Sequence, residues 1–80
     1  MLPKELYISE IQKIREKLAP YILRTPLILN SNDISNELNT KVSLKLEFLQ
    51  HGGTFKVRGA LNNILNLTKE EKKRGVVAVS

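Results

Sequence analysis

Residues 49–61, LQHGGTFKVRGAL, place two glycines, a hydroxyl residue and a lysine directly before an apolar helical pattern. The glycine pair predicts a break in the chain, and Thr54 carries the hydroxyl typical of an N-cap. The apolar positions that follow predict a helix over about 55–67, because they recur at i, i+3, i+4, i+7 and i+8. A cation in the first turn of a helix is disfavoured by about 0.3 to 1 kcal/mol. Lys56 is therefore the first candidate for a functional role.

The chemistry expected of Lys56 follows from its predicted surroundings. The helix start and partial burial beside Phe55 both disfavour the charged form of the amine. A neutral lysine is a nucleophile toward aldehydes, and Schiff-base formation is what pyridoxal phosphate requires. The alternative reading is an ordinary solvent-facing lysine in a first helical turn.

Two strands are expected on either side of this helix. Residues 42–48, VSLKLEF, alternate between apolar and polar side chains, which predicts a strand with one wetter face. Residues 76–79, VVAV, form a continuous apolar run suited to a strand covered on both faces. Between them, Thr68 and Glu71 form a capping-box pattern that opens a short helix closed by Gly75. The order strand, helix, strand predicts a right-handed parallel crossover in an α/β fold.

The part before residue 40 predicts two further helices. Ser9 and Gln12 resemble a capping box ahead of a helix over about 9–19. Residues 24–30, RTPLILN, contain a proline tolerated at a strand start or sheet edge, and a short helix near 31–38 follows. The expected architecture is thus an N-terminal helix followed by an incomplete parallel sheet, since two strands cannot cover each other's faces and edges.

Composition excludes several classes of protein. With 41% hydrophobic and 26% charged residues in 80, the chain reads as one ordinary globular unit. It has no cysteine and one histidine, so disulfides and a metal site are not expected. The net charge of +5 is spread along the sequence, and two glutamates interrupt the run KEEKKR at 69–74. That run indicates a solvated helix face rather than a nucleic-acid interface. Without a signal-type or membrane-spanning apolar run, we expect a cytoplasmic protein with no membrane partner.

Four segments resemble one family in order and spacing. These are RTPL at 24–27, LKLEFLQ at 44–50, GGTFKVRGA at 52–60 and GVVAVS at 75–80. They are similar to the N-terminal region of fold-type II pyridoxal-phosphate enzymes, in the branch of threonine/serine dehydratases and serine racemases. The resemblance runs from about Ile8 to Ser80.

The resemblance implies roles for three consecutive residues. Lys56 would form the Schiff base with pyridoxal 5'-phosphate and act as the base at the substrate's α-carbon. Phe55 would pack near the cofactor ring, with a place in the core as its alternative. Thr54 stands where the family usually has serine; it would contact cofactor or substrate, or act only as an N-cap.

Nearby polar residues have structural interpretations. Glu47 and Gln50 are expected to hold the loop by hydrogen bonds, and His51 is expected to be exposed in the turn. Arg58 is expected to pair with Glu47 or Glu70.

The resemblance implies a lyase that converts L-threonine or L-serine to a 2-oxo acid and ammonia. Residues 1–80 would be the N-terminal fragment of its catalytic domain, because the family's phosphate and substrate-carboxylate motifs would lie beyond residue 80. The full-length protein would be a homo-oligomer. The open alternatives are a serine racemase, another fold-type II enzyme, a catalytically silent fragment, or a small basic module that binds nucleic acid.

Overall fold

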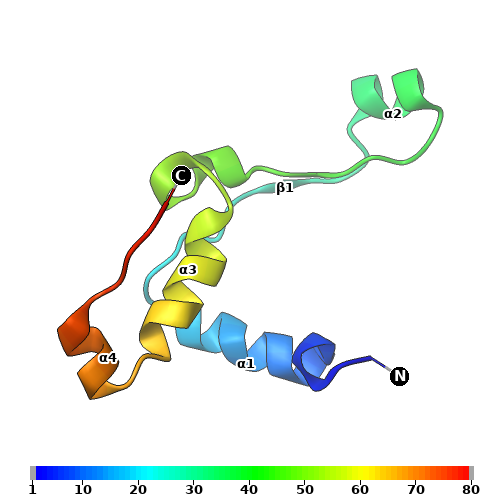
Figure 1. Cartoon of the computed structure of the whole chain (residues 1–80). Helices are drawn as coiled ribbons and strands as arrows, with labels where there is room; N and C mark the ends of the chain where they lie inside the picture. Colours follow the sequence, from blue (N-terminus) through cyan, green and yellow to red (C-terminus); the bar gives the residue numbers. More distant parts are fainter. Residues whose placement is uncertain (1, 80) are drawn as a thin grey trace.

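A two-stranded hairpin and four α-helices make up the chain in the computed structural model, which describes residues 2–79 (Figure 1). The helices are α1 (Ile8–Leu18), α2 (Asn32–Leu38), α3 (Lys56–Leu65) and α4 (Lys69–Arg74). The strands are β1 (Leu27–Ile28) and β2 (Leu44–Lys45). Short 3₁₀ turns lie at η1 (Lys4–Leu6), η2 (Glu47–Leu49) and η3 (His51–Gly53). Helices and strands together confirm the α/β content, and no helix in the described part of the chain is long and apolar enough to cross a bilayer.

The hairpin is antiparallel, with Leu27 opposite Lys45 and Ile28 opposite Leu44. Backbone hydrogen bonds continue the pairing at both ends, from Ser31 N–H to the Val42 carbonyl at 2.8 Å and from Leu46 N–H to the Pro26 carbonyl at 3.0 Å. Figure 1 shows the hairpin as an extended arm that carries α2 at its far end.

The predicted parallel sheet is not confirmed. The expected strand over 42–48 is regular only at Leu44–Lys45 and then turns into η2. Residues 76–79 form no strand, and Val77 and Val79 are 94% and 95% exposed; Ser80 lies outside the described residues. A strand is defined by its hydrogen-bonded neighbour, and nothing between residues 2 and 79 pairs with the apolar run. The apolar pattern of residues 76–79 predicts a buried strand, but the described residues provide no strand that pairs with it.

Helices α1 and α3 pack against each other, and Lys17 Nζ donates a hydrogen bond to Asn66 Oδ1 just beyond α3. Helix α1 begins at Ile8, one residue earlier than predicted, and ends at Leu18. The capping box predicted at Ser9 is wrong, because Tyr7 occupies the N-cap and no side-chain cap bond is formed. The spacing of apolar residues therefore fixed this helix better than the capping pattern did.

Helix α4 begins as its sequence predicts. Glu71 N–H donates to Thr68 Oγ1 at 3.1 Å, and Thr68 N–H donates to the Glu71 carboxylate at 2.8 Å. Gly75 ends the helix at φ 83°, a torsion that other residues rarely adopt. The capping box and the glycine stop are confirmed because both depend only on residues close in sequence.

Few side chains are buried. In residues 2–79 the buried ones are Leu18, Thr25 and Gln50, two of which are polar. The radius of gyration is 16.5 Å, whereas a compact domain of this length has about 12 Å. The chain therefore relies on few apolar contacts of its own.

We expect the 80-residue chain, made alone, to melt without a sharp transition and to self-associate, because its valines at 76, 77 and 79 are exposed and its core is sparse. Circular dichroism during heating and analytical ultracentrifugation test this. A cooperative melt of a monomer would contradict it.

Candidate functional site

Lys56 is the first residue of α3 and follows a turn built on two glycines. Gly52 and Gly53 have φ of 81° and 73°, in the left-handed region that favours glycine. Gly53 N–H donates to the Gln50 carbonyl at 2.8 Å and closes the turn. The glycine pair thus redirects the chain from η2 into α3 and delivers Lys56 at the start of the helix.

Thr54 accepts a hydrogen bond from the backbone of Lys56. Its own torsions are extended (φ −146°, ψ 173°), whereas Phe55 already has helical torsions (φ −74°, ψ −8°). The Lys56 N–H donates to Thr54 Oγ1 at 3.2 Å. This bond is of the kind an N-cap side chain makes, but the N-cap of α3 is Phe55, which forms no side-chain cap bond, so Thr54 lies one residue before the predicted position. A contact between Thr54 and a cofactor or substrate stays a prediction.

Lys56 and Phe55 are both exposed, with Phe55 at 69%. The expected partial burial of Lys56 is therefore wrong for this chain, since no other described segment covers the start of α3. The alternative that placed Phe55 in the core is also wrong within residues 2–79. Its packing against a cofactor ring stays a prediction.

Glu47 accepts hydrogen bonds from two separate segments. Arg58 donates from Nε to Oε2 at 2.8 Å and from Nη2 to Oε1 at 2.9 Å, and Thr25 Oγ1 also donates to Oε1. The Glu47 side chain is 16% exposed and that of Arg58 is 35% exposed. These bonds, those of Arg58 first, lower the pKa of Glu47 to about 2, and the same pair raises the pKa of Arg58. Of the two partners predicted for Arg58, Glu47 and Glu70, the structure shows Glu47.

Gln50 holds the other side of the turn. Its side chain is buried; Oε1 accepts from Leu23 N–H at 2.9 Å, and Nε2 donates to the Leu23 carbonyl at 2.7 Å. Oε1 also accepts from the N–H of His51, whose side chain is exposed. The loop-holding role predicted for Glu47 and Gln50 is confirmed, as is the exposure of His51.

No role was predicted for Thr25 or for the basic groove beside it. Thr25 is 4% exposed and supplies both a hydroxyl donor to Glu47 and a carbonyl acceptor to Lys45 Nζ at 2.7 Å. The available signal was the RTPL segment itself, in which a threonine precedes the proline.

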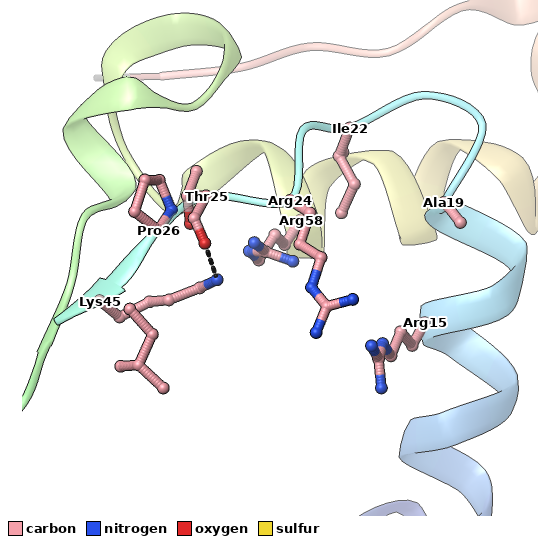
Figure 2. A pocket seen from close by; sticks show the side chains of 9 residues that line it. Arg15, Ala19, Ile22, Arg24, Thr25, Pro26, Lys45 and Arg58 are labelled. Atoms are coloured by element: carbon pink, nitrogen blue, oxygen red, sulfur yellow. Dashed lines mark hydrogen bonds between the residues drawn. The ribbon is translucent and has the colours of Figure 1, made fainter. Parts of the chain in front are cut away.

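The groove beside Thr25 has a volume of about 710 Å³. Figure 2 shows its basic side chains, which come from α1, from the segment before β1, from β2 and from α3. They are Arg15, Arg24, Lys45 and Arg58. Lys56 is not among the lining residues, so the groove and the candidate lysine are distinct parts of this surface.

The residues at the start of α3 fit the aldehyde-bearing end of pyridoxal phosphate. A primary amine is the group that condenses with that aldehyde, and Lys56 is exposed. A Cβ added at Gly52 would meet no atom within 4 Å, and at Gly53 only the Phe48 carbonyl oxygen at 4.0 Å. The turn before α3 is therefore uncrowded, and glycine is required at 52 and 53 by the positive φ angles rather than by lack of space.

Comparison with known families agrees with this chemistry. The sequence model of the family described as pyridoxal-phosphate dependent enzyme matches residues 18–80. The matched region contains β1, β2, the glycine turn and all of α3 and α4. The cofactor that the sequence predicts is thus confirmed at the level of the family.

Two curated relatives have informative names. A protein of Sinorhizobium fredii named "Putative threonine dehydratase" is 43% identical over 75 residues, covering 94% of this chain and 22% of the relative. The "L-threonine dehydratase catabolic TdcB" of Staphylococcus aureus strain USA300 is 40% identical over 73 residues, covering 91% and 21%. The chain thus spans about a fifth of the length of these relatives. No solved structure matches it.

We expect Glu47 to stay ionised to unusually low pH. Because its pKa in the folded chain is lowered from 4.5 to about 2, its stabilising contribution is complete above pH 4.5 and is lost as the pH falls toward 2. Carboxyl carbon shifts of labelled glutamate measure this titration by NMR. In Arg58→Gln the midpoint should rise, and a midpoint of 4.5 for Glu47 in the unaltered chain would contradict the assignment.

Proposed function

Because the chain belongs to the family of pyridoxal-phosphate dependent enzymes, we propose that Lys56 is the residue that binds the cofactor's aldehyde carbon. The observation that carries this proposal is the position of Lys56: exposed, first in α3, and directly after an open glycine turn. The free space around Gly52 and Gly53 leaves room for a ligand near the start of α3. The hydrogen bond that Thr54 Oγ1 accepts from the Lys56 N–H holds the backbone from which the lysine side chain extends.

The proposed reaction is removal of water and then ammonia from L-threonine or L-serine, which yields a 2-oxo acid. The names of the two relatives support this reaction class. Bound pyridoxal phosphate supplies an electron sink that makes the α-proton of the amino acid removable. Once the substrate's amino group has displaced Lys56 from the cofactor's aldehyde carbon, the freed Nζ would take up the α-proton and return a proton to the β-hydroxyl, which leaves as water with the C–O bonding electrons while the α-carbon's electrons form the new double bond. The nitrogen leaves as ammonia when water restores the carbonyl oxygen of the 2-oxo acid.

Two neighbours of Lys56 have proposed supporting roles. Phe55 offers an exposed aromatic face beside the lysine, which suits packing against a pyridine ring. Thr54 offers a hydroxyl already directed at the helix start. Its oxygen can accept one further hydrogen bond from a ligand while it holds the bond from the Lys56 N–H.

We also propose that residues 1–80 act within a larger catalytic domain. The coverage of the relatives supports this, as do the many exposed apolar side chains, which a further part of a domain would bury. Such a part would also supply the phosphate-binding groups. Homo-oligomerisation of the complete protein stays a prediction.

In the complete protein, we expect borohydride reduction to fix pyridoxal phosphate on Lys56, as read by peptide mapping. Lys56→Ala should abolish turnover and the label while leaving the fold, because the side chain is exposed. Lys69→Ala is the matched control, since Lys69 is the first residue of α4 and is also exposed. A label on another lysine would overturn the proposal.

We expect the complete enzyme to form 2-oxobutanoate from L-threonine faster than it interconverts L- and D-serine. A coupled assay for the keto acid and chiral chromatography of serine measure the two rates on one preparation. Racemisation with no keto acid would move the protein to the racemase branch.

A further inference from the structure

We propose that Glu47 is a positioning residue for Lys56, acting through a clamp that consists of Thr25, Glu47 and Arg58. The clamp joins three segments: the one before β1, the 3₁₀ turn η2 that follows β2, and the first turn of α3. This inference rests on the proposed function of Lys56 and concerns how that lysine is held.

The clamp holds α3 at its first turn. Arg58 lies two residues after Lys56, within the same helical turn. Its side-on pair of hydrogen bonds with Glu47 fixes both the distance and the orientation of the guanidinium plane. Figure 2 shows Arg58 and Thr25 entering the same region from different elements. A shift of the first turn of α3 would therefore break two bonds at once.

Among the described residues, few packing contacts restrain the turn that precedes Lys56. Residues 51–56 are all exposed, and an added Cβ at either glycine meets almost nothing. Packing therefore does not set the path of the turn. Polar anchors at its two ends do: Gln50 bound to Leu23 on one side, and Arg58 bound to Glu47 on the other.

The charge of the Glu47 carboxylate is needed for this contact. Glu47 accepts three hydrogen bonds on two oxygens, two of them from a guanidinium. The low pKa of Glu47 agrees with an anion stabilised by those donors. Glutamine in its place keeps the shape but has one acceptor oxygen and an NH₂ group, so Arg58 loses its partner charge and one bond.

The test uses the complete protein loaded with pyridoxal phosphate and compares Glu47→Gln with Glu71→Gln. Glu71 is the matched control because it also has a lowered pKa from local hydrogen bonds, but it acts in the capping box of α4. The readouts are amide hydrogen exchange and the pH dependence of the absorption band of the bound cofactor.

In Glu47→Gln we expect exchange at the amides of 54–58 to rise about tenfold, the effect of one lost charge-assisted hydrogen bond. The pH midpoint of the absorption band should shift as the lysine loses its fixed position. Glu71→Gln should raise exchange only around α4 and leave the band unchanged. Thr25→Val should reproduce part of the Glu47→Gln effect. Thr25→Ser, which keeps the hydroxyl, should behave like the unaltered protein.

The outcomes separate the two proposals. If borohydride labels Lys56 but Glu47→Gln changes neither exchange at 54–58 nor the band, the clamp is overturned and the proposed function stands. If Lys56 is not labelled in the unaltered protein, the proposed function fails, and with it the positioning role. An equal effect of Glu71→Gln on the band would also overturn the clamp, because the response would then be a general loss of stability.

Discussion

The Glu47 carboxylate is the point at which three segments of this chain meet. It lies just after the hairpin, accepts a hydrogen bond from the Thr25 hydroxyl and forms an ion pair with Arg58 in α3. In a chain with one buried apolar side chain among residues 2–79, such polar bonds decide how the elements sit relative to one another. A half-buried ion pair serves this purpose because it is directional, whereas apolar contact is not.

Local features of the fold were predictable from sequence because the interactions that form them are local. The capping box of α4, the glycine turn and the presence of α3 each depend on residues within a few positions of one another; α3 is found at Lys56–Leu65, against about 55–67 predicted. An ion pair of Arg58 with Glu47 or Glu70 was also predicted, and the structure selects Glu47. The pairing of strands was not predictable, because the apolar pattern of 76–79 indicates burial but does not indicate which strand lies beside it.

The candidate site shows the same division. Lys56 was identified by its position in a family-like segment, and the structure places it where an amine is accessible. Its expected burial failed because covering a helix start requires a second surface, which residues 2–79 do not provide. Thr25 escaped notice because its role depends on Glu47, 22 residues away, and no pattern of spacing connects them.

Ionic strength affects two kinds of interaction in the groove differently. The groove's basic residues are Arg15, Arg24, Lys45 and Arg58. Arg15 and Arg24 are exposed, so their attraction for anions falls off beyond a Debye length, which is about 8 Å in physiological salt. The Arg58 pair with Glu47 is half-buried and closely hydrogen-bonded, so mobile ions screen it less. Added salt thus weakens the attraction of the groove for distant anions. It has a smaller effect on the Arg58–Glu47 ion pair, which forms part of the groove's wall.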